Sequence, residues 1–451
     1  MPRYRFITIS IALPGVATGH MAHDTSFTRY RRFCQAWLCL SWLCLSWLCL
    51  SSLATGLAQD ARADESERIS QLRDRGAAVQ LKEGHAVSAD LSQLDPEPAD
   101  LQALAGLPQL KKLVLFGRRI SDDSIPLIMA IPALEDLTME KVEVTDAGLK
   151  QLSQMKQLRR ISLPLSSASD EGLQNLAAIP GLTHVSLLRT NTGDGTLTAL
   201  AETQQLELLD VRYTKVSNKG IAALANQEKL KNFKGTGKAI GDKSAAVLAG
   251  IPTLKAIGLD DTDITDDGLA ELSKLPNVIE LYLTRVYITD AGLPHLGKMT
   301  KLNKLRIRGI AISGTDLSPL SPLTELTEID LSETALRDPG VKALAKLPKL
   351  ASVNLWLTLV GDAAIDDLTT MPKLTTLNLD KTAITDAGIK KLEGFDQLKW
   401  LHVGSTNITD QSIPALSSLK NLSYLSITFT KITEAGYEKL QAALPNTKIE
   451  H

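Results

Sequence analysis

The chain has 451 residues, of which 44% are hydrophobic and 22% charged, with 29 glycines and 19 prolines. The hydrophobic fraction excludes a largely disordered chain, and glycine without a three-residue period excludes a collagen-like one. The formal net charge of −2 leaves no strongly basic surface of the kind that attracts nucleic acids or anionic membranes.

The N-terminal region, residues 1–63, has the layout of an export signal. A cluster of arginines ending at Arg32 precedes an apolar run that repeats the motif SWLCL and passes into small residues. A basic segment, an apolar stretch and a small-residue site together are typical of secretory signals. We predict cleavage after Ala58 or Ala63. The alternative is an uncleaved anchor over residues 37–57, which is about long enough to span a bilayer.

All four cysteines lie in this same region, between Cys34 and Cys49. The remaining body, residues 64–451, therefore has no disulfide, no thiol nucleophile and no thiolate metal site. Residues 1–63 also hold six arginines and two aspartates, a net +4, so the body carries −6 where the whole chain carries −2.

Two short segments are predicted to open the body. The sequence DESERISQLRDRGAA, residues 64–78, indicates a polar lead-in helix. Two short apolar stretches, 79–81 and 87–91, predict an opening hairpin or a first strand. We place the lead-in and the start of an N-terminal cap at 64–86, and a repeat domain at 87–451.

The repeat domain shows a constant period of 24 residues. Fourteen anchor residues, mostly aliphatic, follow one another at this interval: Ile120, Val144, Ala168, Thr192, Val216, Ile240, Ile264, Ile288, Ile312, Leu336, Val360, Ile384, Ile408 and Ile432. Such regularity is the signature of a solenoid, in which coils that cannot fold alone stack on their neighbours. Residues 444–449 close the series as half a repeat.

Each copy contains the signals of a strand, a turn and a short helix. One clean copy, residues 374–392, reads LTTLNLDKTAITDAGIKKL. Its Leu-x-Leu part has the period of a strand, and the apolar spacing of three further on predicts a short α or 3₁₀ helix. The Thr-Asp pair predicts a helix N-cap. The following glycine leaves room for the neighbouring coil, and a threonine before the anchor can bond backbone groups of the bend. That threonine recurs at 190, 214, 262, 334, 358, 382, 406 and 430.

These residues resemble the leucine-rich repeat family, whose L-x-x-L-x-L-x-x-[N/C/T]-x-I pattern they follow over roughly 87–451. The Ile-Thr-Asp-x-Gly-Leu signature is similar to the cysteine-containing repeats of F-box substrate receptors, with Thr for Cys, and to bacterial exported leucine-rich repeat proteins. The resemblance implies an α/β solenoid, a horseshoe of about 14 repeats with a parallel β-sheet on the concave face and short α or 3₁₀ helices on the convex face.

The outward strand positions supply the candidate ligand-binding residues of the concave face. Small residues occupy the first copies, whereas large polar and aromatic ones occupy the later copies. Exposed aromatic residues with arginine nearby are typical of binding hot spots. The alternative is that they only cover the sheet or fill gaps between neighbouring coils. The candidates are Tyr282, Arg306, Arg308, Asn354, Trp356, Asn378, Trp400, His402 and Tyr424.

Two other segments depart from the repeat. The run Asp260–Asp267 holds five aspartates. It lacks the spacing and the glycine of an EF-hand, so a solvated acidic edge is favoured over a calcium site. Residues 233–238 place Gly235 where an apolar residue belongs, which suggests a softer joint. No catalytic set falls on neighbouring coils, and we predict no enzyme activity, no metal and no cofactor.

We therefore expect a non-enzymatic, exported binding protein, in the periplasm, at the cell surface or secreted. Its partner would be a protein, with a glycan as the alternative ligand and no nucleic acid. Contact with a membrane would occur only through an uncleaved N-terminal segment. The competing interpretations are an F-box-like adaptor, implied by the repeat type alone, and a structural component of the cell envelope without a specific ligand.

Overall fold

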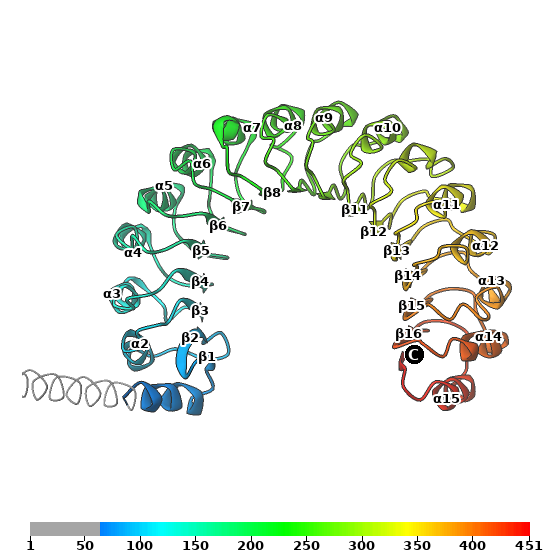
Figure 1. Ribbon diagram of the computed structural model, residues 1–451, viewed down its shortest axis with the longest axis horizontal. Helices are drawn as coiled ribbons and strands as arrows, with labels where there is room; N and C mark the ends of the chain where they lie inside the picture. Colours follow the sequence, from blue (N-terminus) through cyan, green and yellow to red (C-terminus); the bar gives the residue numbers. More distant parts are fainter. Residues whose placement is uncertain (1–63) are drawn as a thin grey trace, which may run out of the picture. The chain divides into compact units, whose positions relative to one another are not determined.

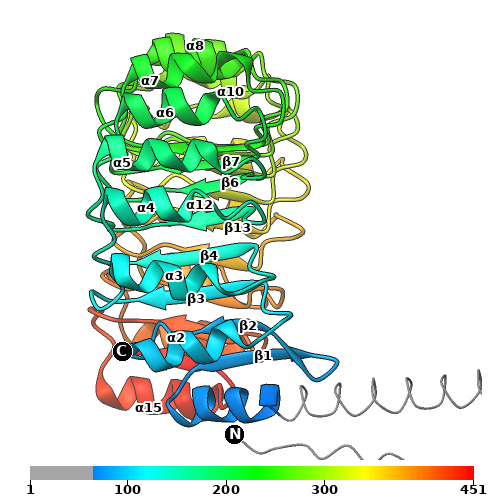
Figure 2. The same cartoon turned by 90° about the vertical axis from the view of Figure 1, so that its left-hand side faces the viewer.

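The computed structural model describes residues 64–451, and its repeat unit runs from Glu67 to His451. The predicted signal, residues 1–63, and the alternative anchor at 37–57 lie outside the described residues. Within the repeat unit, the strands line the inner side of an arc and the helices its outer side (Figure 1). The successive helices lie one above another when the unit is seen from its outer side (Figure 2). This arrangement is the predicted solenoid.

The described residues form one sheet of 17 strands. The strands are β1 (Ala78–Lys82), β2 (His85–Asp90), β3 (Lys112–Phe116), β4 (Asp136–Glu140), β5 (Arg160–Ser162), β6 (His184–Ser186), β7 (Leu208–Val211), β8 (Asn232–Gly235), β9 (Ala256–Gly258), β10 (Glu280–Tyr282), β11 (Lys304–Arg306), β12 (Glu328–Asp330), β13 (Ser352–Asn354), β14 (Thr376–Asn378), β15 (Trp400–His402), β16 (Tyr424–Ser426) and β17 (Lys448–Glu450).

Helices connect the strands. The α-helices are α2 (Pro98–Ala105), α3 (Ile125–Met129), α4 (Asp146–Leu152), α5 (Asp170–Gln174), α6 (Asp194–Ala201), α7 (Asn218–Ala222), α8 (Asp242–Ala249), α9 (Asp266–Leu272), α10 (Leu293–Leu296), α11 (Asp338–Leu344), α12 (Ala364–Leu368), α13 (Asp386–Lys390), α14 (Ile413–Ser418) and α15 (Glu434–Ala443). The 3₁₀ helices are η1 (Asp122–Ser124), η2 (Asn175–Ala178), η3 (Ala223–Asn226), η4 (Asp290–Gly292), η5 (Ser318–Leu320) and η6 (Asp410–Ser412). Residues 67–74 are also helical.

The strands pair in the order of the sequence. β1 and β2 form an antiparallel hairpin, as predicted. From β2 onward the pairing is parallel, and each residue faces the one 24 positions later, as Ser88 faces Lys112 and Leu401 faces Leu425. β17 pairs with β16 in the same register, so the predicted half-repeat closes the sheet. The ladder thus extends one strand beyond the fourteen predicted copies at each end.

The consensus aliphatic residues form a continuous core between the sheet and the helices. In the copy read above, six of them have no exposed surface: Leu374, Leu377, Leu379, Ile384, Ile389 and Leu392. The alternating strand side chains that are not in this core face the inner side of the arc, because strand side chains alternate between faces. Each outward strand position therefore forms a row of side chains along the inner face, with one side chain from every coil.

A tight turn follows each strand. All eight repeated threonines donate their hydroxyl to the carbonyl three residues earlier, as Thr382 does to Leu379 at 2.5 Å. The hydroxyl therefore closes a turn within its own coil, at the bend that follows the strand. The residue before it has a positive φ in every copy, 54° at Lys381, although only three of these fourteen residues are glycine. The N–H of Lys381 donates to the carbonyl of Gly404 in the next coil, which helps to hold this conformation.

The repeated aspartate has a different role from the predicted cap. Thr385 caps α13, since its hydroxyl accepts from the N–H of Ala387. The neighbouring Asp386 instead reaches the next coil, where its two oxygens accept from the N–H and the hydroxyl of Thr409 at 2.8 Å each. A Cβ atom on Gly388 would lie 2.2 Å from Oδ1 of Asp362 in the preceding coil. The repeated glycine was predicted to leave room for the neighbouring coil. The group that occupies this room is the aspartate carboxylate of the preceding coil.

The two irregular coils differ from expectation. At the suspected joint, β8 pairs with β7 over four residues, and Phe233 is fully buried. A Cβ on Gly235 would lie 3.2 Å from the Phe233 ring, so the large side chain fills the space beside the glycine. The coil after β11 departs further from the pattern, because Gly314 replaces the bridging aspartate and the 3₁₀ helix η5 replaces the α-helix.

Candidate ligand-binding face

The nine candidate residues lie on or shortly after six strands of the inner face, and all nine are half-buried. Tyr282 ends β10, Arg306 ends β11 and Arg308 follows it; Asn354 ends β13 and Trp356 follows it; Asn378 ends β14; Trp400 and His402 belong to β15 and Tyr424 to β16. The parallel register brings most of them into two groups, which we call the arginine cluster and the aromatic stack.

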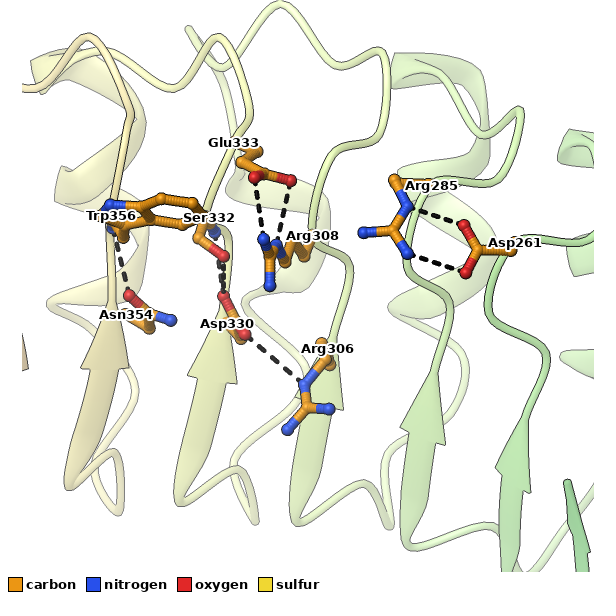
Figure 3. Close-up of polar contacts among 9 residues, drawn as sticks. All are labelled: Asp261, Arg285, Arg306, Arg308, Asp330, Ser332, Glu333, Asn354 and Trp356. Carbon is orange, nitrogen blue, oxygen red and sulfur yellow. Dashed lines mark hydrogen bonds and ion pairs between the residues drawn. The ribbon is translucent and has the colours of Figure 1, made fainter. Parts of the chain in front are cut away.

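The arginine cluster comprises Tyr282, Arg306, Arg308 and Trp356, and Figure 3 shows the last three of these side chains. The Arg308 guanidinium donates to both oxygens of Glu333, at 3.0 and 2.8 Å. Its neighbour Arg306 lies over the Tyr282 ring, 5.2 Å from the centroid. Bidentate arginine–carboxylate pairs fix the position of the guanidinium as well as its charge.

Carboxylates on adjacent coils balance each arginine of this region. Arg306 lies 3.5 Å from Asp330, and Arg285 donates to both oxygens of Asp261 at 2.7 Å (Figure 3). These hydrogen bonds raise the pKa values of Arg285 and Arg308 and lower those of Asp261 and Glu333. The groups therefore stay ionised, and the cluster presents a fixed pattern of alternating charge.

Trp356 lies between two cations. The Arg308 guanidinium carbon is 4.8 Å from the centroid of the Trp356 ring, and Nζ of Lys381 in the next coil is 5.7 Å from it. Tryptophan is the best aromatic partner for such cations because its ring face is the most electron-rich. The indole is therefore held in place while remaining half-exposed on the inner face.

The aromatic stack comprises Trp400, His402 and Tyr424. The rings of Trp400 and Tyr424, which face each other across β15 and β16, are nearly parallel, with centroids 5.0 Å apart and planes 8° apart. The Tyr424 hydroxyl donates to Glu450 at 2.6 Å. The His402 ring is tilted against Trp400 with a centroid distance of 5.9 Å. The stack is thus anchored to the last strand of the sheet.

Asn354 and Asn378 have a structural role that the sequence did not indicate. Each accepts, through its side-chain oxygen, the backbone N–H two residues later, from Trp356 at 3.1 Å and from Asp380 at 3.0 Å. Asp330 makes the same bond to Ser332. These side chains satisfy N–H groups at the point where the strand ladder ends. Among the described residues the two amide nitrogens have no partner, so they remain available to a ligand on the inner face.

Burial shifts the ionisation of three side chains in the two groups. Burial and the hydrogen bond with Glu280 raise the pKa of Tyr282 to about 12. Burial, followed by the bond with Glu450, raises the pKa of Tyr424. Burial lowers the pKa of His402, although Asp380 and Glu450 oppose the shift. At neutral pH both tyrosines and the histidine are uncharged.

The aspartates of the acidic run Asp260–Asp267 bind different partners and do not converge on one point. Asp260 accepts the N–H of Thr284, Asp261 pairs with Arg285, and Asp266 bridges to Thr289 in the next coil. Within residues 64–451, no three His, Cys, Asp or Glu side chains gather in a way that would hold a metal ion. The same part of the chain has no helix with the length and apolar character needed to cross a bilayer.

Sequence reasoning missed two surface features. The first is the positive-φ position after each strand, which exposes large side chains such as Leu357 and Phe429, the latter 90% exposed. Glycine occupies this position at 117, 237 and 309, and these glycines could have indicated a positive φ from the sequence. The second is a cleft of about 440 Å³ beside the first residues of β3 to β6, lined by charged side chains including Lys112, Asp136 and Arg160.

Comparisons with known proteins agree with this architecture. The family model described as "Leucine Rich repeat" matches residues 323–345 and 370–392. An internalin of Listeria monocytogenes is similar in structure, with 21% identity, a TM-score of 0.51, and coverage of 79% of this chain and 88% of that chain. A leucine-rich repeat protein of Leptospira interrogans shows 17% identity, a TM-score of 0.53, and coverage of 78% and 87%. No curated protein matches the chain. The repeat pattern, the parallel register and these likenesses together show that the chain has the leucine-rich repeat fold.

Proposed function

We propose that the protein recognises a partner protein through the inner face of β10 to β16, using the arginine cluster, the aromatic stack and the two asparagines between them. It does so without chemistry of its own. The observation that carries the proposal is the position of Trp356, held between Arg308 and Lys381 on an open face. Tryptophan, tyrosine and arginine are the residues that dominate binding hot spots.

The fixed geometry of both groups supports this function. Arg308 is held by Glu333, and the Trp400 ring is stacked on Tyr424. Side chains that are ordered before binding lose less conformational entropy when a ligand arrives. Fixed side chains therefore favour selective recognition over a surface that adapts to many ligands.

The spread of the candidate residues favours a protein over a small ligand. They extend from β10 to β16, six strand spacings, or about 29 Å at the usual separation of paired strands. A protein interface buries about 800 Å² on each side and matches this span, whereas a drug-sized ligand fits a single pocket. A glycan remains the alternative ligand, and an extended one would be needed to reach both groups.

The layout of residues 1–63 supports export, and we propose that the lead-in at 64–86 and the repeat domain at 87–451 act outside the cytoplasm. The mature chain would begin near Gln59 or Asp64. Intact-mass measurement of the purified protein tests this. A mass that retains residues 37–57 would contradict cleavage and favour a membrane anchor, and a cytoplasmic protein would reopen the F-box-like adaptor role.

Affinity capture tests the binding proposal. The purified protein would serve as bait for envelope and secreted extracts of the source cell, beside a variant carrying Tyr282→Ala, Arg306→Ala, Trp356→Ala and Trp400→Ala. We expect a protein that the native bait retains and the variant loses, while circular dichroism shows that the variant is folded. Equal retention by both baits would place the site elsewhere. Capture of no protein would favour the structural role, and glycan arrays would then test the alternative ligand.

A further inference from the structure

The cleft beside β3 to β6 lies outside the proposed recognition face. Its lining comes from two residues per coil, the first residue of each strand and the one before it, from β3 to β6, together with Glu207 just before β7. A volume of about 440 Å³ lies in the range of small-ligand sites. We call it the rim cleft.

The charges of the rim cleft alternate from coil to coil. The coil of β3 contributes two lysines, that of β4 contributes Glu135 and Asp136, and that of β5 contributes Arg159 and Arg160. Lys111 pairs with Glu135 at 2.9 Å, and Arg160 lies 3.8 Å from Asp136. Each cationic coil thus has an anionic neighbour, as the sheet register places them side by side.

The alternation fails at the coil of β6. Two acidic residues would continue the pattern there, but Thr183 and His184 occupy these positions. Beyond them Glu207 is held by Lys231 at 2.7 Å and does not supply the missing charge. In the described part of the chain, the Arg159 guanidinium has no carboxylate partner and donates only to the carbonyl of Gly181, at 3.4 Å. The β6 side of the two arginines therefore lacks a negative group.

The hydrogen bonds of Thr183 determine the state of His184. The Thr183 hydroxyl lies 3.0 Å from the carbonyl of Arg159 and 2.9 Å from Nδ1 of His184; when it donates its one proton to the carbonyl, Nδ1 donates to the hydroxyl. In the neutral ring Nε2 is then a free acceptor, and protonation converts it to a donor. Burial lowers the pKa of His184, and Arg160 and Lys231 act in the same direction, whereas Glu207 and Asp136 oppose the shift.

We propose that the rim cleft binds carboxylate groups of an acidic segment of a partner protein, with Arg159, Arg160 and His184 as the receiving residues. The incoming carboxylate supplies the negative charge that a pair of acidic residues in the coil of β6 would have supplied. It pairs with the two guanidinium groups and accepts a hydrogen bond from protonated His184. Binding is therefore accompanied by proton uptake, and the affinity rises as the pH falls from 8 to 6, where glutamate side chains remain ionised. This site is independent of the function proposed for β10 to β16.

Titration of the full chain with a hexaglutamate peptide, followed by calorimetry at low salt, tests the proposal. We expect measurable binding that weakens as salt is added, because the contacts are ionic. Hexaglutamine should not bind. The double variant Arg159→Gln, Arg160→Gln should bind hexaglutamate about tenfold more weakly or worse, as expected for the loss of charge-assisted hydrogen bonds. Lys304→Gln is the matched control, because Lys304 holds the same strand position in β11, and it should retain native affinity.

Proton NMR of the His184 ring gives a second readout that does not depend on the double variant being folded. Addition of hexaglutamate to the native chain should raise the pKa of His184 and leave that of His402 unchanged. Three results would each overturn the proposal: no binding of hexaglutamate, equal loss of affinity in the Lys304→Gln control, or an unchanged His184 titration in the presence of bound peptide.

Discussion

The two halves of the inner face share one backbone and differ in their side chains. Around β3 to β6 the central outward positions hold Val114, Thr138, Ser162 and Ser186, and the charges lie at the rim. From β10 onward the same positions hold Tyr282, Arg306 and larger polar residues, with aromatic rings on both sides. The register of 24 residues is identical in both halves. Packing therefore constrains the inward positions, while the outward positions are free to differ between the two regions.

The largest expected effect tests whether the two halves are equivalent as scaffolds. Leu137 and Leu377 occupy the same core position in β4 and β14, and neither has exposed surface. Replacement of either by alanine should lower the free energy of unfolding by about 2–5 kcal/mol. Urea unfolding followed by circular dichroism measures both. A difference of several kcal/mol between the two variants would show that the core itself differs between the halves.

The aspartate bridges between coils give the next largest effect. Asp122 and Asp362 each accept the N–H and the hydroxyl of the threonine in the next coil, Thr145 and Thr385. Asp122→Ala and Asp362→Ala should each cost about 1–3 kcal/mol, since a backbone N–H loses its partner. Exposed Asp123, directly beside Asp122, provides the control, and Asp123→Ala should leave the unfolding midpoint nearly unchanged. Equal destabilisation by the control would contradict the bridging role.

The same bridges predict a loss of stability in acid in both halves. Burial raises the pKa values of Asp170 and Asp386, but hydrogen bonds from Thr196 and Gly193, and from Ser412 and Thr409, outweigh it, so both pKa values are lowered. A lowered pKa in the folded state means that the stabilisation is complete above the unfolded value of about 3.9 and is lost as the pH falls below it. Thermal unfolding between pH 7 and pH 3 should show a decline confined to the acidic end, and Asp386→Asn should make that decline shallower. A decline that begins near pH 6 would require a different group.

The smallest effect separates the environments of the two inner-face histidines. Burial lowers the pKa of both His184 and His402, but Arg160 lies near the first and Asp380 near the second. Arg160→Gln should raise the pKa of His184 and leave that of His402 unchanged, whereas Asp380→Asn should lower the pKa of His402 alone. Proton NMR titration of the two rings measures both. A parallel shift of both histidines in either variant would mean that their surroundings are not distinct.

Much of the fold follows from the sequence because the same packing requirement recurs in fourteen copies of the repeat. Aliphatic residues such as Leu377 must point inward in every coil, so their period reveals the coil length and the strand position. The turn threonines were predicted for the same reason, and Thr382 shows the expected bond to the bend. The role of Asp386 was not predictable from its position beside a helix cap, because its partner, Thr409, lies in the next coil.

The candidate site was predicted only as a set of residues on one face. The pairing of Trp356 with Arg308 and Lys381 depends on side-chain directions at three coils, which the period does not specify. The hydrogen bonds that the side-chain oxygens of Asn354 and Asn378 accept from the backbone could not be predicted for the same reason. The rim cleft was missed because its residues look like ordinary surface charges, although the neutral pair Thr183 and His184 interrupts their alternation.

The most direct test of the account compares matched substitutions in the two halves. Once a partner is captured, calorimetry would measure its dissociation constant for two variants, both folded by circular dichroism. One carries Tyr282→Ala, Arg306→Ala, Trp356→Ala and Trp400→Ala; the other carries Val114→Ala, Thr138→Ala, Ser162→Ala and Ser186→Ala at the small central positions of β3 to β6. We predict that the first variant binds at least about thirtyfold more weakly than the native chain, as the loss of one hot spot of about 2 kcal/mol requires, and that the second binds as the native chain does. Equal affinity of both variants, or a loss confined to the second, would contradict recognition by the inner face of β10 to β16.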